Sequence, residues 1–249
     1  MFSILDRNRV RDRVLALASA DVRVVAGAVV GSLAHTGGDR WSDLDLTFAV
    51  ADDAPLRAVL EDWTRILVQE FKAAPLFDLP SGASIYRVFL LPGCLQFDLS
   101  FTPAAHFGAN GPQFQLLFGH AVEKPYPQPP AAHELLGYAV HHALRARFCI
   151  ERSRFWQAEY WISSTRDCAL SLACLRLGLP TSYGRGFDAL PTAVREPMVN
   201  ALVQALTRDE LLRALGCAIE GLLREGVAVP GLAAQVELQL RELMAPWAA

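Results

Sequence analysis

Two periodicities alternate along the first hundred residues, one typical of strands and one typical of helices. Residues 22–30 and 85–91 are mainly apolar runs, and residues 43–50 and 94–101 alternate between apolar and polar, which predicts four strands. Residues 6–20 and 55–72 repeat apolar side chains every three or four positions, which predicts two helices. Pro92 and Gly93 predict a hairpin between the last two strands. This order is typical of a small mixed sheet backed by helices.

After residue 131 the apolar positions recur with helical spacing, which predicts helices at residues 131–150, 153–177, 191–206, 208–225 and 231–244. Residues 101–132 show no clear period, and a turn is predicted at Pro80, Ser81 and Gly82. The sequence KPYPQPP predicts a stiff connector at residues 125–130. We therefore expect an α+β protein with a small mixed-sheet domain at residues 1–124 and an all-α helical bundle at residues 131–249.

Two aspartates with strand spacing and a Gly-Ser turn are the strongest candidates for chemistry. Asp43 and Asp45 are two residues apart, so a strand directs both carboxylates to one face and the intervening leucines to the other. Neighbouring carboxylates repel each other unless a cation lies between them, and Mg²⁺ prefers carboxylates together with phosphate oxygens. Gly31 and Ser32, at the end of the first strand, form a turn that suits phosphate oxygens.

The Gly31-Ser32 turn, followed after a loop by Asp43-Leu44-Asp45, resembles the signature of the nucleotidyltransferase superfamily, the polymerase β-like fold. In that superfamily a third acidic residue lies on a later strand, and Asp98, on the polar face of residues 94–101, matches it. The resemblance implies that the three aspartates hold two Mg²⁺ ions, while Gly31 and Ser32 bind the triphosphate. The alternative is that Asp43 and Asp45 are solvent-facing residues of an edge strand and that Asp98 is an isolated exposed aspartate.

The composition excludes several classes of protein. The chain has 249 residues, of which 52% are hydrophobic and 20% are charged, a balance typical of globular proteins. The net charge of −3, without any basic run, argues against a nucleic acid partner. The five scattered cysteines predict free thiols in a cytoplasmic protein. We see no secretory signal and no apolar run long enough to span a membrane.

Glu159 lies in the aromatic segment FWQAEYW of the helical half. This half resembles, more loosely, that of aminoglycoside-modifying nucleotidyltransferases, in which a carboxylate of the C-terminal domain deprotonates the acceptor hydroxyl. Glu159 is the expected base, because burial among aromatic groups raises the pKa of a carboxyl toward the working pH. Two alternatives stay open: Glu159 forms an ion pair with Arg152 or Arg166, and the aromatic residues beside it belong to the core.

Two arginines in Gly-rich loops are further candidates for nucleotide contacts. Arg40 lies in the signature loop together with His35 and Asp39, and Arg185 lies in the loop after the long helix. A guanidinium pairs well with phosphate oxygens, so both arginines are expected to bind the nucleotide. For Arg185 the alternative is a plain connection between two helices.

The leading hypothesis is an enzyme that uses Mg²⁺ to transfer a nucleoside monophosphate, with AMP from ATP as the expected case, to a hydroxyl of a small molecule such as an aminoglycoside- or lincosamide-like antibiotic. The expected partners are a nucleoside triphosphate and a small acceptor, without nucleic acid or membrane. A homodimer is compatible with the resemblance. The alternatives are a protein-modifying, AMPylating nucleotidyltransferase of antitoxin type, and a catalytically inactive relative that binds nucleotides.

Overall fold

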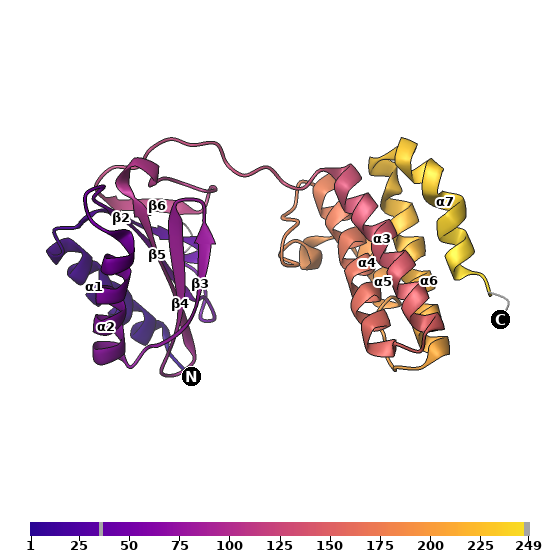
Figure 1. The fold of residues 1–249 in the computed structure, drawn as a ribbon, viewed down its shortest axis with the longest axis horizontal. Coiled ribbons are helices and arrows are strands. Elements are labelled where there is room, and N and C mark those ends of the chain that lie inside the picture. The colour runs from indigo at the N-terminus through magenta and orange to yellow at the C-terminus, as the bar shows by residue number, and fades with distance from the viewer. Residues whose placement is uncertain (35–36, 247–249) are drawn as a thin grey trace. The chain divides into compact units, whose positions relative to one another are not determined.

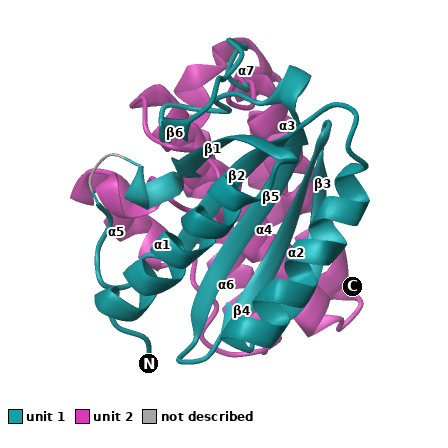
Figure 2. Ribbon diagram, turned by 90° about the vertical axis from the view of Figure 1, so that its left-hand side faces the viewer, with its two compact units in different colours: residues 1–127 teal, residues 128–249 magenta. Residues whose placement is uncertain are grey.

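The computed structural model describes residues 1–34 and 37–246, which form two compact units, Met1–Pro127 and Gln128–Ala249 (Figure 1, Figure 2). Unit 1 contains a mixed sheet with helices, and the elements of unit 2 are helical, so the protein belongs to the α+β class, as expected. The division between the units falls within the Pro-rich segment 125–130. No helix in the described part of the chain combines the length and the apolar composition that a membrane crossing requires.

Unit 1 is built on a single mixed sheet. Its elements are α1 (Ile4–Ala20), β1 (Val24–Val30), β2 (Leu44–Val50), α2 (Leu56–Phe71), β3 (Ala74–Ser81), β4 (Ser84–Leu91), β5 (Leu95–Pro103) and β6 (Phe114–Phe118). The strands are ordered β3-β4-β5-β2-β1-β6. β2 and β5 pair in parallel, whereas the other neighbouring strands are antiparallel. The expected hairpin joins β4 to β5.

One face of this sheet carries the core of unit 1, and the opposite face carries polar residues. Both α1 and α2 pack on the core face. The predicted alternation is confirmed, because the apolar positions of the two central strands are fully buried there: Leu44, Leu46, Phe97, Leu99 and Phe101. On the opposite face the hydroxyls of Ser100 and Thr47 form a hydrogen bond of 2.8 Å between β5 and β2. The period of two therefore separates the main hydrophobic core from a face that carries buried hydroxyls beside a smaller apolar cluster, Ala26, Ala28, Ala49 and Phe107.

The sequence pattern missed both outer strands of the sheet. β3 extends through Pro80 to Ser81, where a turn was predicted, and β6 lies in the region that showed no period. Every residue of β3 is exposed, so no core contact imposes an apolar alternation on it. Proline is tolerated at such an edge because its missing N–H removes no bond from the sheet interior.

Unit 2 consists of α3 (Ala132–Glu151), α4 (Phe155–Arg176), α5 (Thr192–Val199), α6 (Arg208–Glu225) and α7 (Pro230–Met244), with short 3₁₀ turns at Phe187–Ala189 and Gly226–Ala228. α3 and α4 form a helical hairpin whose contact surface is rich in buried alanines: Ala139, Ala143, Ala146, Ala158 and Ala169. Arg147, fully buried in α3, donates from Nη1 to the carbonyl oxygens of Leu243 at 2.6 Å and Ala245 at 3.0 Å. This arginine therefore fastens the end of α7.

The helix predicted at residues 191–206 is shorter than expected, because α5 ends at Val199. Arg213 of α6 donates from Nη1 to the carbonyl of Asn200 at 2.6 Å and from Nη2 to the carbonyl of Leu202 at 3.1 Å. These charge-assisted bonds satisfy carbonyls that a longer helix would pair internally. Arg213 of α6 therefore stabilises the segment that follows the end of α5.

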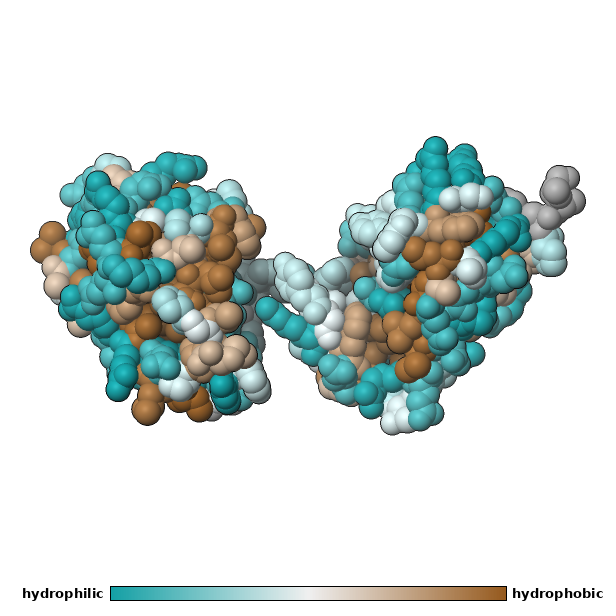
Figure 3. Space-filling view, turned by 90° about the horizontal axis from the view of Figure 1, so that it is seen from below, coloured by the Kyte–Doolittle hydropathy of each residue, from teal (hydrophilic) through white to brown (hydrophobic). Residues whose placement is uncertain are grey.

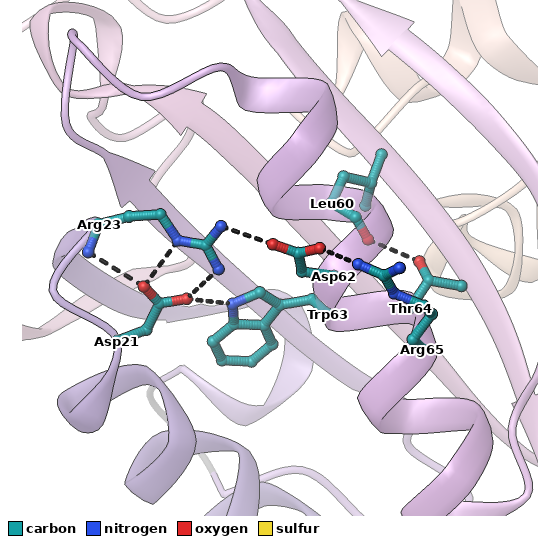
Figure 4. A network of polar contacts seen from close by, with 7 residues as sticks. All are labelled: Asp21, Arg23, Leu60, Asp62, Trp63, Thr64 and Arg65. Carbon is teal, nitrogen blue, oxygen red and sulfur yellow. Dashed lines mark hydrogen bonds and ion pairs between the residues drawn. The ribbon is translucent and has the colours of Figure 1, made fainter.

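A polar network joins the start of β1 to α2 (Figure 4). The carboxylate of Asp21 accepts hydrogen bonds from Arg23 Nε at 2.9 Å and from the indole Nε1 of the buried Trp63 at 2.9 Å. Arg23 Nη1 also donates to Asp62 at 2.7 Å, and Arg65 donates to the same carboxylate. The hydrogen bond from Arg23 is the main cause that lowers the pKa of Asp21 to about 2.

This network makes the stability of the protein depend on pH. The pKa of Asp21 is depressed from 3.8 to about 2, so its contribution is complete above pH 3.8 and is lost as the pH falls toward 2. We expect Asp21→Asn to lower the free energy of unfolding by about 1–2 kcal/mol at neutral pH, and by less as the pH falls. Urea unfolding at several pH values measures this. The exposed Asp12→Asn is the control, and an Asp21→Asn effect that is constant down to pH 2 would contradict the assignment.

Candidate functional site

Three aspartates converge on the polar face of the sheet in unit 1. Asp45 of β2 and Asp98 of β5 are direct partners in the parallel register, and Asp43 immediately precedes β2. Each contributes one carboxylate oxygen to a group in which all oxygens lie within 4.8 Å of one another. Among the described residues, this is the only set of three or more acidic, His or Cys side chains with such spacing. The three side chains are half-buried, which differs from the exposed edge strand of the alternative interpretation.

The electrostatics of this carboxylate cluster favour a bound cation. Burial raises the pKa of Asp98 above its usual value, and the negative charge of Asp43 raises it further, while a hydrogen bond from Gln96 Nε2 to Asp98 at 3.0 Å acts in the opposite direction. Two charged carboxylate oxygens within 4.8 Å of each other repel by at least roughly 3 kcal/mol at an effective dielectric constant of about 20. Carboxylate oxygens are the ligands that Mg²⁺ prefers, so this donor set fits a divalent cation that removes the repulsion.

The turn after β1 places main-chain atoms against this cluster. Gly31 begins a 3₁₀ turn, Gly31–Leu33, that also contains Ser32, and its φ is +70°, a conformation that favours glycine. A Cβ atom at Gly31 would lie 2.5 Å from Oδ2 of Asp45. The Gly31 N–H donates to the carbonyl of Gln113 at 3.2 Å, which ties the turn to the segment before β6. Glycine is thus required by both the backbone conformation and the space beside Asp45.

The signature loop between the turn and β2 is organised by its own polar groups. Oδ1 of Asp39 accepts hydrogen bonds from the N–H of Trp41 at 2.8 Å and from Oγ of Ser42 at 3.0 Å, so this carboxylate is engaged within the loop. The exposed Arg40 places its guanidinium 4.4 Å from the ring centre of Trp41. Arg40 is therefore accessible to an anion, while the candidate His35 lies outside the described residues.

A shallow cavity of about 620 Å³ lies beside the first residue of β6 and is lined in part by a lysine that the sequence pattern did not single out. It is lined by Phe114 and Lys124, among others, and Phe114 pairs with Val30, the residue before Gly31. Burial lowers the pKa of Lys124, whose Nζ lies 3.4 Å from the carbonyl of His106. Lys124 therefore lines a cavity beside the strand pair that leads to the turn. The one sequence signal was the rarity of lysine, since Lys72 is the other one in the chain.

Glu159 lies on α4 in unit 2, with an exposed aromatic surface around it. Trp156 and Tyr160 are 79% and 60% exposed, so they do not belong to the core, and Trp161 is half-buried against His142. Hydrophobic residues reach the surface of both units (Figure 3). The aromatic residues beside Glu159 are therefore available to a ligand.

The ion pair that was the alternative role of Glu159 is not formed among the described residues. Arg166 pairs with its neighbour Asp167 at 2.8 Å, and the described partner of Glu159 is the hydroxyl of Ser163, which donates to Oε1 at 2.8 Å. Glu151, by contrast, accepts from Arg208 and Arg147, which together lower its pKa. Of these two glutamates, Glu159 is the one that no described arginine neutralises.

Arg185 lies in the loop between α4 and α5. Its guanidinium stacks 5.5 Å from the ring centre of Tyr183, which is 93% exposed. The loop closes by main-chain bonds, including Phe187 N–H to the carbonyl of Gly184 at 3.0 Å. These contacts suit a helix connection, and the exposed guanidinium is also accessible to an anion.

The chain has a structural likeness to a known protein but no match to a family model or a curated protein. No protein-family model matches the chain, and no curated protein matches it. Among solved structures, the chain is similar to the crystal structure of an aminoglycoside 6-adenyltransferase from Bacillus subtilis, with 14% sequence identity and a TM-score of 0.43 over 99% of this chain and 100% of that chain. A likeness of this degree does not assign a family, an activity or a substrate.

Proposed function

We propose that the protein is a Mg²⁺-dependent nucleotidyltransferase that moves a nucleoside monophosphate, AMP from ATP, to a hydroxyl of a small molecule. The observation that carries the proposal is the convergence of Asp43, Asp45 and Asp98 beside Gly31. Three half-buried carboxylates on one polar sheet surface form a poor structural element, because they repel each other, but a good ligand set for Mg²⁺. A glycine turn at their side lets phosphate oxygens approach the backbone.

Each group of unit 1 has a role in this reaction. When bound, Mg²⁺ would neutralise the phosphate oxygens and stabilise the charge that develops on the attacking and leaving oxygens. The three aspartates would hold the metal, and Gly31 and Ser32 would bind the triphosphate. The acceptor oxygen attacks the α-phosphorus, and the bond from that phosphorus to the pyrophosphate oxygen breaks. Arg40 and Lys124 supply positive charge for the triphosphate. In this proposal Arg185, a residue of unit 2, serves the same purpose.

Glu159 takes the proton of the acceptor hydroxyl in this proposal. Its carboxylate has no basic partner among the described residues, and the exposed Trp156 and Tyr160 lie within one turn of it on α4. Aromatic faces pack against the apolar faces of sugar-like rings, and a carboxylate attracts an amine on the same molecule. These features support an aminoglycoside- or lincosamide-like acceptor.

The test of the proposed function is pyrophosphate release from MgATP, and from the other nucleoside triphosphates, with a panel of aminoglycosides and lincosamides. Release that requires an acceptor and is absent from Asp45→Asn would establish the activity and identify the nucleotide. Failure of every acceptor, despite Mg²⁺-dependent ATP binding, would reject a small-molecule acceptor of these classes and direct the search to protein acceptors.

Glu159→Gln tests the assignment of the base. We expect kcat to fall by about 10²–10⁴, because an amide cannot accept the hydroxyl proton, while the KM for ATP stays unchanged. The amide oxygen can still accept from Ser163, so thermal unfolding should be unaltered. Glu151→Gln is the matched control, since its carboxylate is neutralised by Arg147 and Arg208. A larger loss of kcat in Glu151→Gln than in Glu159→Gln would reassign the base.

A further inference from the structure

Arg7 of α1 is a buried arginine that contacts the signature loop. Its side chain is 1% exposed, and its Nη1 donates to two carbonyl oxygens, those of Asp39 and Ser42, both at 2.7 Å. Its Nε has no hydrogen-bond partner among the described residues. Within the described chain it forms no ion pair with a carboxylate. This arginine therefore bonds directly to two main-chain oxygens, and its charge is one of the causes that lower the pKa of Asp39.

A buried guanidinium of this kind is a weak stabilising device. Removing the charge from water costs several kcal/mol, and carbonyl oxygens offset less of that cost than a carboxylate would. Replacement of Arg7 by an apolar side chain removes this desolvation cost but leaves the carbonyls of Asp39 and Ser42 without their donor, so the two effects on stability oppose each other. The contribution of Arg7 is therefore better explained by the conformation that it selects than by the free energy of folding.

The conformation selected is that of the loop that leads into the carboxylate cluster. Asp39 N–H donates to Oγ of Ser42 at 2.9 Å, and Oγ of Ser42 donates back to Oδ1 of Asp39, so the loop is closed on itself. Gly38 has φ +63°, and a Cβ there would lie 2.7 Å from Cδ2 of Leu33 in the Gly-Ser turn. The loop is thus packed against the turn. Arg7 binds the carbonyls at both ends of its last segment, residues 39–42.

Asp43 is the member of the cluster that needs this support. Asp45 and Asp98 are held by the hydrogen-bonded ladder between β2 and β5, whereas Asp43 precedes the first residue of β2. The carbonyl of Ser42 belongs to the peptide bond that connects directly to Asp43. Anchoring that carbonyl limits the positions that the Asp43 carboxylate can reach.

We propose that Arg7 is a positioning residue that sets the place of Asp43, and thereby the affinity of the three-aspartate cluster for a divalent cation. This inference rests on the proposed function only in its metal assignment. Residues that orient metal ligands from behind contribute about 10–100-fold to metal affinity. Arg7 acts through the main chain of the loop and does not contact the metal.

The test measures binding of Mn²⁺ alone to the full chain, by electron paramagnetic resonance of the free ion, beside urea unfolding. We expect Arg7→Met to weaken Mn²⁺ binding by at least about tenfold, with a change in unfolding free energy too small to leave the protein unfolded. Arg7→Lys should be intermediate, because lysine keeps the charge and several N–H donors, but its side chain is one atom too short to place them where Nη1 of Arg7 lies.

The matched control is Arg147→Met in unit 2. Arg147 is also 1% exposed and also donates from Nη1 to two carbonyl oxygens, but it fastens α7 and not the signature loop. It should lower stability at least as much as Arg7→Met and leave Mn²⁺ affinity unchanged. Asp39→Ala is an independent variant that keeps Arg7. When it is combined with Arg7→Met, the loss of Mn²⁺ affinity should be smaller than the sum of the two separate losses, because both substitutions act through one loop.

The outcomes separate the inference from the proposed function. If wild type binds Mn²⁺, Asp45→Asn abolishes binding and Arg7→Met matches wild type, then Arg7 has no positioning role and the metal assignment stands. If folded wild type binds no Mn²⁺, both the metal assignment and the role of Arg7 are overturned. An equal loss of affinity in Arg7→Met and Arg147→Met would show a general loss of stability and would overturn the positioning role.

Discussion

Asp45→Asn is expected to reduce nucleotidyl transfer by at least about 10³-fold while the protein stays folded. Asp45 is central in the cluster, since it is paired with Asp98 across the sheet and lies against Gly31. The amide has nearly the same shape but no negative charge, so it holds a divalent cation poorly. A metal contributes several kcal/mol of transition-state stabilisation, and about 4 kcal/mol corresponds to a factor of 10³.

The stability of Asp45→Asn should remain within about 1 kcal/mol of wild type, because the substitution also removes repulsion between neighbouring carboxylates. Pyrophosphate release and urea unfolding measure the two effects separately. Asp53→Asn, at an exposed position in the turn after β2, is the control and should keep full activity. Full activity in a folded Asp45→Asn protein would reject the metal assignment.

Gly31→Ala is the second substitution with a large expected effect. A φ of +70° costs a non-glycine residue about 1–2 kcal/mol, and the new Cβ would lie 2.5 Å from Oδ2 of Asp45. The turn or the carboxylate must therefore move. We expect transfer activity to fall by about 10²-fold, because displacements of about 1 Å at a reacting site have effects of this size.

Gly37→Ala separates the two causes. Gly37 has nearly the same φ, +71°, but a Cβ there would have no atom of the described residues within 4 Å. Both variants should lose about 1–2 kcal/mol of stability from backbone strain, measured by urea unfolding. Only Gly31→Ala should lose most of its activity. Equal activity in the two variants would show that the contact with Asp45 is unimportant for the reaction.

The central part of the sheet followed from the sequence because its pattern is imposed by local geometry. Alternation in β2 and β5 placed the leucines in the core and Asp45 and Asp98 on polar faces, and burial confirms the alternation. The sequence pattern did not predict the outer strands β3 and β6, because an edge strand makes few core contacts. A strand without a buried face has no reason to alternate.

The aromatic residues of α4 show where periodicity misleads. Helical spacing alone leaves Trp156 and Tyr160 free to be core or surface, and core is the commoner outcome. The hairpin of α3 and α4 instead buries alanines, including Ala143 and Ala158, which let the two helices approach closely. The rings of Trp156 and Tyr160 lie outside this core, on the exposed side of α4.

The sequence by itself determined the strand faces, the glycine turn and the presence of three aspartates in the right order, because each depends on neighbours within a few residues. Only the tertiary structure decided that β2 and β5 are parallel neighbours, which brings Asp98 beside Asp45 across more than fifty residues of chain. The tertiary structure alone also showed that Arg7 binds the carbonyls of Asp39 and Ser42, in the loop that leads to Asp43. Pairing between distant strands and burial of a side chain depend on how the whole unit packs, and no local pattern records them.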